Sequence, residues 1–356
     1  MAYTTIDKPT DYFNTVLYTG DASSPRTISG VGFSPDWVWC KNRTTANDNR
    51  LVDQVRGANK ELSSNRTLAE YSDNSDGNLT AFTSDGFTIT QGSANINNWN
   101  KNTDSYVVWN WLAGGTASSN TDGSITSSVS ASTTAGISIV SYTGNATNGA
   151  TVGHGLGAVP DMLIGKDLSD GSGWGIWHKN LSGATYRLAF TTDAQSNDSF
   201  LFGGSGNTLP TSTVFTLGSG GGLNGSNANI VYAFTSIKGY SKFGSYTGNG
   251  NNDGTFVYTG FKPAFLMVKK SSASGSDWNL HHNKSPGFNV NDNYLAPNSS
   301  AAEVTNNSFQ IFDLLSNGFK CRGTGTGTNA SGETHIYMAF AENPFVTSGG
   351  IPTTAR

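Results

Sequence analysis

The sequence repeats one pattern of landmarks three times along its length. In each copy an apolar strand ends in Tyr-Thr-Gly, a proline follows 17 or 18 residues after the tyrosine, and an apolar run then ends in lysine six residues past the proline. An aromatic strand closes each copy. The landmarks are Tyr18, Pro35, Lys41 and Trp111, then Tyr142, Pro160, Lys166 and Phe234, then Tyr246, Pro263, Lys269 and Phe340. Self-similarity of this kind predicts three tandem copies of one folding unit.

Each copy has the length and composition of a small all-β domain. Glycine supplies 44 residues, charged residues make up only 13%, and Gly, Ser, Thr and Asn separate short apolar and aromatic runs. Such sequences favour short strands joined by tight turns, whereas helices use more Ala, Leu, Glu and Lys. We therefore predict an all-β protein of three tandem antiparallel β-sandwich units, each about 100 residues long.

Shifts in composition predict where these units begin and end. The segment after the first copy consists almost wholly of Gly, Ser, Thr, Ala and Asn, which is typical of a flexible linker. Its Thr121-Asp122-Gly123 step equally favours a type I′ turn and an extra edge hairpin. The predicted divisions are unit 1 at 1–113, this linker or hairpin at 114–136, unit 2 at 137–238, unit 3 at 239–345 and a polar C-terminal tail at 346–356. We expect the units to be beads and not a continuous stack, with units 2 and 3 forming a rigid pair because 239–242 leaves almost no linker between them.

The apolar strands differ in their expected exposure. The run after each proline, such as Trp37-Val38-Trp39-Cys40, is apolar on both sides of its pleat and predicts a strand buried on both faces. The closing strands alternate more, as in Val108-Trp109-Asn110-Trp111, and predict one covered face and one face nearer solvent. Cys40 and Cys321 lie far apart in the sequence and are expected to be buried free thiols.

The charge balance argues against several partners. A formal net charge of −4 gives no basic surface for nucleic acid, so no nucleic-acid partner is expected. No run approaches the roughly 18 apolar residues of a membrane helix, so no membrane insertion is expected. The first residues have neither a basic start nor an apolar stretch, which predicts synthesis without a secretory signal.

The motifs of common enzymes and metal sites are missing from the sequence. There is no His-Glu-x-x-His motif, no zinc-type Cys/His spacing, no Gly-x-Ser-x-Gly elbow and no phosphate-binding loop. The five glutamates do not alternate along a strand as the acids of jelly-roll glucanases do. We therefore expect no enzyme activity, no cofactor and no metal.

Three tryptophans and two histidines are the candidate ligand-binding residues. Trp174 and His178 in the second copy match Trp278 and His282 in the third, and Trp99 stands among asparagines. Aromatic rings beside amide and hydroxyl groups are suited to stacking against sugars. The alternative is that each Trp–His pair packs at a strand end, and the first copy has Arg50 and Gln54 at these places.

Several stretches resemble virion proteins of tailed bacteriophages, especially marine ones. They are Ala-Tyr-Thr-Thr-Ile-Asp-Lys-Pro at 2–9, Phe-Ser-Pro-Asp-Trp-Val-Trp-Cys-Lys-Asn-Arg at 33–43, Val-Arg-Gly-Ala-Asn-Lys-Glu-Leu-Ser-Ser-Asn at 55–65, Ser-Asp-Gly-Phe at 84–87 and Ile-Tyr-Met-Ala-Phe-Ala-Glu at 336–342. The first copy resembles these proteins closely and the other two copies more loosely. The resemblance implies a tail-fibre or other virion-surface component with concanavalin-like, jelly-roll sandwich domains, and it implies no catalytic residues.

Two functions from different classes are consistent with these features. The first is a virion-surface, receptor-binding protein of tail-fibre type that contacts host surface glycans without catalysis. The second is a capsid decoration protein that stabilises the shell, and a polysaccharide depolymerase using an acidic pair such as Asp193 and Glu303 is a minor third. The expected partners are other tail or capsid proteins and possible host glycans, within a homotrimer or a single chain of pseudo-three-fold symmetry.

Overall fold

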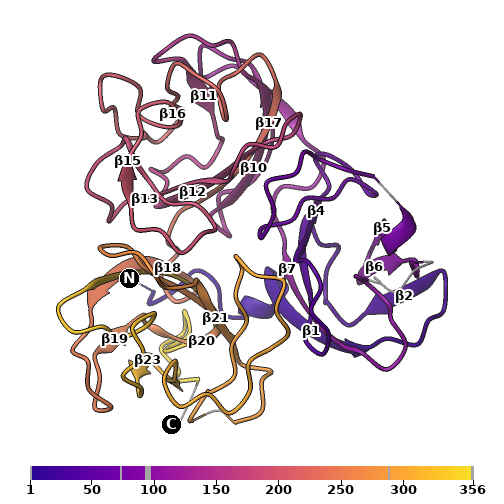
Figure 1. The fold of residues 1–356 in the computed structure, drawn as a ribbon, viewed down its shortest axis with the longest axis vertical. Coiled ribbons are helices and arrows are strands. Elements are labelled where there is room, and N and C mark those ends of the chain that lie inside the picture. Colours follow the sequence, from indigo (N-terminus) through magenta and orange to yellow (C-terminus); the bar gives the residue numbers. More distant parts are fainter. Residues whose placement is uncertain (1, 73, 93–97, 288, 354–356) are drawn as a thin grey trace.

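The computed structural model describes residues 2–72, 74–92, 98–287 and 289–353. The protein is all-β, and its antiparallel sheets form three groups arranged around a common centre (Figure 1). We call these groups unit 1 (β1–β7), unit 2 (β8–β17) and unit 3 (β18–β24). The described helices are two short 3₁₀ turns, η1 (Pro9–Asp11) and η2 (Asn74–Asp76).

Unit 1 contains a four-stranded sheet and a smaller three-stranded sheet. The larger sheet has the order β1 (Phe13–Thr19), β7 (Ser105–Trp111), β3 (Trp37–Asn42) and β4 (Arg50–Asp53). The smaller sheet has the order β2 (Arg26–Ser29), β6 (Gly86–Ile89) and β5 (Leu79–Thr83). The first strand of the copy therefore pairs with the last, and the strand after the proline lies on the other side of that last strand.

Unit 3 has the same strand order. Its larger sheet runs β18 (Ser241–Thr247), β24 (Thr334–Pro344), β20 (Phe261–Lys270) and β21 (Asn279–His282). Its smaller sheet runs β19 (Phe256–Tyr258), β23 (Gly318–Cys321) and β22 (Phe312–Leu315). The sequence repeat is therefore a repeat of topology, strand for strand.

Unit 2 contains the same framework with an added hairpin. Its large sheet runs β13 (Gly175–His178), β12 (Met162–Asp167), β17 (Ala228–Phe234), β10 (Ile137–Thr143), β9 (Ser127–Ser132) and β8 (Ser118–Asn120). The remaining strands form two short pairs, β11 (Thr151–Gly153) with β16 (Val214–Thr216) and β14 (Tyr186–Arg187) with β15 (Ser196–Asn197). Of the two alternatives for 114–136, the structure contains the hairpin, β8–β9, which extends the sheet beyond β10.

The long strands send alternate side chains into two different hydrophobic clusters. On β3, Trp37 and Trp39 belong to a central cluster shared by all three units, whereas Val38 and Cys40 belong to an outer cluster inside unit 1. Strands β12, β17, β20 and β24 alternate in the same way between the central cluster and the outer cluster of their own unit. Each outer cluster takes side chains from both the large and the small sheet of its unit.

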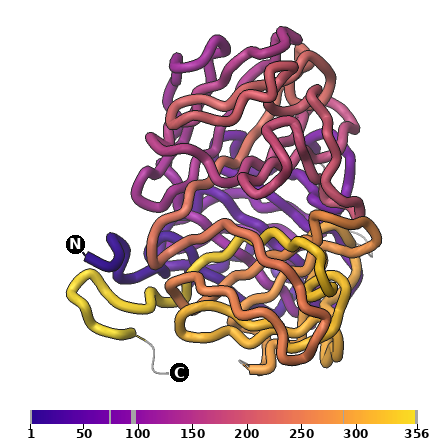
Figure 2. The backbone as a smooth tube through the Cα atoms, turned by 90° about the vertical axis from the view of Figure 1, so that its left-hand side faces the viewer, coloured from indigo at the N-terminus to yellow at the C-terminus, as the bar shows by residue number. Residues whose placement is uncertain are grey.

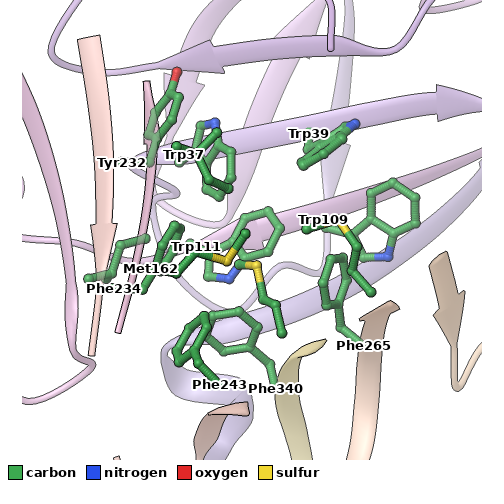
Figure 3. Close-up of a cluster of buried hydrophobic side chains, with 14 of the residues drawn as sticks. Trp37, Trp39, Trp109, Trp111, Met162, Tyr232, Phe234, Phe243, Phe265 and Phe340 are labelled. Atoms are coloured by element: carbon green, nitrogen blue, oxygen red, sulfur yellow. The ribbon is translucent and has the colours of Figure 1, made fainter. Parts of the chain in front are cut away.

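The central cluster corrects two expectations from the sequence. Trp37 stacks on Trp111 at 4.3 Å between ring centroids and on Tyr232 of unit 2 at 4.4 Å (Figure 3). Phe13 stacks on Phe340 of unit 3 at 5.1 Å. The units are therefore not separate beads, because they share a core. The prediction of a solvent-near face on the closing strands was also wrong, because the face opposite the unit's own core packs in this centre.

A similar head-to-tail contact joins each unit to the next. The indole nitrogen of Trp174 in unit 2 donates to the carbonyl oxygen of Ser63 in unit 1 at 2.9 Å, and that of Trp278 in unit 3 donates to Ala189 in unit 2 at 2.8 Å. Asn49 of unit 1 closes the ring by donating to the Ser299 carbonyl of unit 3 at 3.0 Å. Contacts of this type close into a ring, which gives the chain approximate three-fold symmetry.

The lysine that ends the strand after each proline is buried in all three units. Lys41 donates to the Asn42 carbonyl at 2.9 Å, Lys166 to the Asp167 carbonyl at 2.7 Å and Lys269 to the Ser276 carbonyl at 2.6 Å. Burial lowers the pKa of Lys41 and of Lys269 to about 8. These ammonium groups donate to backbone carbonyls of the last strand residue in units 1 and 2 and of the following loop in unit 3, so the repeated lysine has a structural role.

The N-terminal and C-terminal segments leave the same side of the body (Figure 2). The N-terminal segment is held on the junction of units 2 and 3, where Thr4 donates its hydroxyl hydrogen to the Lys238 carbonyl at 2.8 Å. The C-terminal tail folds back on itself through a bridge between Val346 and Pro352. The Ser348 amide donates to the Asp7 carboxylate at 2.6 Å, which ties the two ends of the chain together.

Candidate functional site

The three tryptophans proposed as ligand-binding residues are buried. Trp174 and Trp278 lie in the central cluster, at the junctions between units, and donate to backbone carbonyls of the neighbouring unit. Trp99 lies inside unit 1, and its indole nitrogen donates to Glu61 at 2.7 Å. None of these three rings presents an exposed face on which a sugar could stack.

The two candidate histidines are buried as well. The Nδ1 atom of His178 accepts the Asn180 amide hydrogen at 3.1 Å, and Nδ1 of His282 accepts that of Lys284 at 3.2 Å. Burial lowers the pKa of His178 to about 3 and also lowers that of His282. Both rings are therefore neutral at neutral pH and organise the turn after their strand, which matches the packing alternative for the Trp–His pairs.

One cluster at the junction of units 1 and 3 contains a serine, a histidine and a carboxylate, like the triad of a hydrolase, but its histidine is not protonated as a general base requires. His282 Nε2 lies 3.2 Å from the Ser285 hydroxyl and 3.7 Å from Glu303. Because Nδ1 accepts the Lys284 amide hydrogen, the neutral ring carries its proton on Nε2, and it cannot remove the proton of Ser285. Glu303 is also paired with Arg43 at 2.8 Å, so this cluster joins two units.

Each acid of the suggested catalytic pair bonds to another residue, and the described residues form neither a metal cluster nor a membrane-spanning helix. Asp193 of the suggested acidic pair accepts a hydrogen bond from the Thr191 hydroxyl at 2.9 Å. Within the described ranges, no three His, Cys, Asp or Glu side chains are grouped so as to hold a metal ion. Neither 3₁₀ turn in this part of the chain has the length or the apolar character to span a bilayer.

The surface feature with the most distinctive chemistry is a groove between units 2 and 3. Two adjoining hollows of about 350 and 440 Å³ share Lys179, Lys242 and Tyr258 in their walls. Tyr3 and Lys238 line the first hollow. Phe256 and Asn180 line the second. We call these seven residues together the lysine groove.

The lysine groove carries positive charge that the protein does not neutralise. Lys179 pairs with Asp161 at 3.0 Å, whereas Lys238 and Lys242 have no carboxylate at ion-pair distance among the described residues. Burial, and next to it the charge of Lys179, lowers the pKa of Lys242. An anion bound in the groove would favour the charged form of Lys242 and take the place of a missing counter-ion.

Aromatic rings stand directly beside these ammonium groups. The Lys238 nitrogen lies 4.6 Å from the centre of the Tyr3 ring, and that of Lys242 lies 5.4 Å from the Tyr258 ring. The Tyr3 and Tyr258 hydroxyls are 2.8 Å apart, and Tyr3 also donates to the Gly260 carbonyl at 2.9 Å. Tyr258 is 47% exposed and Phe256 is 45% exposed, so the groove offers ring surface as well as charge.

The equivalent junction of units 3 and 1 has different side chains. A hollow of about 240 Å³ lies there, with Asn14 at the position of Lys242 and Asn283 at the position of Lys179. The lysine groove is therefore not triplicated with the fold. Sequence reasoning missed it because Tyr3, Lys179 and Lys242 are far apart in the chain, and the repeat pattern itself carries no sign of them.

Comparison with known protein families gives a match, which covers most of the chain. Residues 8–344 match a family described as "Domain of unknown function (DUF7483)". No curated protein and no solved structure matches the chain. The matched range extends from just before η1 to the end of β24, so it includes all three units.

Proposed function

Because this chain belongs to the DUF7483 family, whose description names no activity, we propose its function from the structure. It is a non-catalytic surface protein of a bacteriophage virion, of tail-fibre type, that binds host-surface glycans. The lysine groove is the observation that carries this proposal, and it favours acidic glycans. The virion assignment rests on the resemblance of the sequence to tailed-phage virion proteins.

The proposed function includes a proposed fold for each unit, a β-sandwich of the concanavalin-like, jelly-roll kind. The support is that a large antiparallel sheet and a smaller one, which in unit 2 is the pair β11–β16, share one outer cluster in every unit. Such frameworks hold loops rigidly at their edges, and binding residues often lie on loops held by a rigid scaffold. The lysine groove is built in this way, from the turn after β13, the edge of β18 and the strand β19.

The chemistry of the groove suits an acidic polysaccharide. Carboxylate, sulfate or phosphate groups on a sugar would pair with Lys238 and Lys242, which have no carboxylate partner among the residues that the structure describes. The exposed parts of Tyr258 and Phe256 provide apolar surface for the ring of the sugar. Hydrogen bonds of Tyr3 to Tyr258 and Gly260 hold the groove in place before the ligand arrives, which reduces the entropic cost of binding.

A binding assay with defined glycans tests the proposal. Purified full-length protein is titrated with polygalacturonate as an acidic probe and with dextran as a neutral probe of similar size. We expect saturable binding of the acidic probe that weakens with added salt, and no binding of dextran. The double variant Lys238→Gln/Lys242→Gln is expected to bind roughly tenfold more weakly.

A matched variant controls for net charge. Lys284→Gln/Lys320→Gln removes the same number of charges outside the lysine groove and should bind as tightly as the unmodified protein. Equal loss in both double variants would show non-specific attraction and contradict the site. Absence of saturable adsorption of the protein to susceptible host cells would contradict the receptor-binding function as a whole.

Decoration of the capsid is the second candidate, and one observation favours it. The approximate three-fold symmetry of a single chain, with both terminal segments on one side, suits a position on a local three-fold axis of a shell. Electron microscopy of virions with gold-labelled antibody separates the two functions. Labels distributed over the head favour decoration, and a few labels on the tail favour receptor binding.

A further inference from the structure

The three units differ at the outer edge of their first strand. Strands β1, β10 and β18 occupy the same place in the sheet order, next to the closing strand of their unit. In unit 2 the free side of β10 is covered by β9, which pairs with it along six residues from Ser127 to Ser132. In units 1 and 3 the sheet ends at β1 and at β18.

The hydrogen bonds at the two ends of β1 show which of its backbone groups face outward. The Gly20 amide donates to the Asp104 carbonyl, and the Leu112 amide donates to the Tyr12 carbonyl, both at 2.8 Å. In an antiparallel pair the residues bonded to the neighbouring strand alternate, so even-numbered residues of β1 bond to β7. The amides and carbonyls of Thr15 and Leu17 therefore face away from the sheet.

The corresponding groups of β10 are those that β9 covers. Ile139 and Ser141 stand at the positions of Thr15 and Leu17, and they lie opposite Ser130 and Ser128 of β9. Strand β9 is therefore an extended segment of this chain that pairs with an edge of the same geometry, that of β10. Its sequence, Ser-Ser-Val-Ser-Ala-Ser, alternates hydroxyl residues with small aliphatic ones, and Val129 packs into the outer cluster of unit 2.

Of the two uncovered edges, β1 is the more open. On β18 the Phe243 amide already donates to the Ser236 hydroxyl at 3.3 Å, and the Thr247 carbonyl accepts from Thr255 at 2.7 Å. On β1 the Thr19 carbonyl accepts from Arg26 at 2.7 Å, but no described residue bonds to the outward groups of Thr15 and Leu17. Leu17 is also 38% exposed, which leaves an apolar side chain beside the edge.

A hollow beside β1 contains two buried polar atoms without partners. It has a volume of about 240 Å³ and lies between β1 and the turn after β21 of unit 3. Thr15 is only 4% exposed and Asn283 only 8%, yet the Thr15 hydroxyl and the Asn283 side-chain carbonyl make no hydrogen bond in the described part of the protein. A residue directly opposite Thr15 on an added strand would place its side chain on this same face.

We propose that β1 accepts an extended segment of a partner protein as an additional antiparallel strand. The segment would resemble β9, with hydroxyl residues facing the hollow and a small aliphatic residue facing the outer cluster of unit 1. A serine opposite Thr15 would supply the hydrogen bond that the buried hydroxyl lacks, and the backbone of the segment would pair with Thr15 and Leu17. This surface is separate from the lysine groove and does not depend on the glycan-binding function.

The chain supplies its own probe for this site. A capped synthetic peptide with the sequence of residues 126–133, Thr-Ser-Ser-Val-Ser-Ala-Ser-Thr, is added to the full-length protein, and amide hydrogen exchange is followed residue by residue. Saturating peptide is expected to slow exchange of the Thr15 and Leu17 amides roughly tenfold. The same peptide methylated on the nitrogen atoms that face the edge should have no effect.

Variants of β1 test the position of the added strand. Leu17→Pro removes the outward amide, and proline is tolerated at a sheet edge, so the peptide should no longer bind while the thermal midpoint stays nearly unchanged. Should this variant fail to fold, Leu17→Lys keeps the backbone and places a charge at the edge, which should weaken binding several-fold. Ser245→Pro is the matched control at the equivalent position of β18, and it should leave binding intact.

Results of three kinds would overturn the proposal. The first is absence of protection at Thr15 and Leu17 in saturating peptide. The second is protection of β18 instead of β1, or unchanged binding by Leu17→Pro. The third is a concentration-dependent dimer with the Leu17 amide protected in the absence of peptide, because it would show that a second copy of the chain occupies the edge. Titration with polygalacturonate on the same samples keeps failure of this proposal distinct from failure of the glycan site.

Discussion

Strands β10 and β1 occupy equivalent places in their sheets, but they differ in whether another strand covers their outer edge. Both strands begin a copy of the repeat and pair with its closing strand, but β10 is covered by the hairpin β8–β9, whereas β1 ends its sheet. The strands that face the centre show no such difference, since all three units contribute to the central cluster in the same alternating way. The shared core therefore maintains the framework that is repeated three times, while the outer strand edges and the junctions differ from one unit to the next.

A second difference separates the units by their titratable groups. All five histidines lie in units 2 and 3, and burial lowers the pKa of every one, to about 3 for His178 and to about 4 for His281 and His335. Unit 1 instead contains the buried Glu61, whose pKa is raised by burial to about 7. The histidines that bind protons when the chain unfolds in acid therefore lie in units 2 and 3.

Of the changes considered, acidification is expected to lower the free energy of unfolding most. The unfolded chain binds protons on its histidines below about pH 6.5, whereas the lowered pKa values of these histidines mean that the folded chain binds fewer, so stability should fall as the pH drops from 7 towards 5, by on the order of 4 kcal/mol. Glu61 opposes this trend, because its raised pKa favours protonation of the folded state. Chemical denaturation at a series of pH values measures the change. Stability that is flat or rises over this range would contradict the burial of the histidines.

Exposing the edge of β10 should have the next largest effect. Val129→Asp places a charge into the outer cluster of unit 2 and should detach the hairpin, with a loss of about 3 kcal/mol. The uncovered edge should also promote self-association, which analytical ultracentrifugation detects. Ser128→Asp, at an exposed position on the same strand, is the matched control and should change stability little. Equal stability of the two variants would show that the hairpin does not hold the edge.

The head-to-tail junctions should respond to loss of a single hydrogen bond. Trp174→Phe and Trp278→Phe each leave a carbonyl of the neighbouring unit without its indole donor, and each should cost about 1 to 2 kcal/mol. Urea denaturation followed by circular dichroism measures both. Because the units share a core, we expect one cooperative transition in each variant. Two separate transitions would contradict the shared core.

The exposed ion pair at the lysine groove should matter least to stability. The Lys179 side chain, which is 40% exposed, pairs with Asp161. Lys179→Ala removes this ion pair, and the loss of stability should stay below about 1 kcal/mol. Arg43→Ala at the junction of units 3 and 1 is the informative comparison, since it leaves the buried Glu303 without its cation and should cost more. A larger effect of the Lys179 variant would mean that the groove itself stabilises the junction.

Much of the framework could be predicted from the sequence because it depends on local patterns. The repeat of tyrosine, proline and lysine located the strands, and Asp122-Gly123 indicated a hairpin turn within 114–136. Reading burial from one strand at a time failed where the partner lies in another unit. The alternation of the closing strand predicts one face nearer solvent, whereas Trp111 on that strand contacts Phe265 and Phe340, which come from a unit more than 150 residues away.

The strand content and the triplication could be inferred from the sequence, as could the position of the lysine that ends the strand after each proline, because these features follow from neighbouring residues. The tertiary structure was needed to show that the units close into a ring and that Trp174 and Trp278 lie at its junctions. It was also needed to show that Tyr3, Lys179, Lys238 and Lys242 meet in one groove. The physical reason is that junction contacts join residues far apart in the chain, and the hydropathy of one segment carries no information about its distant partner.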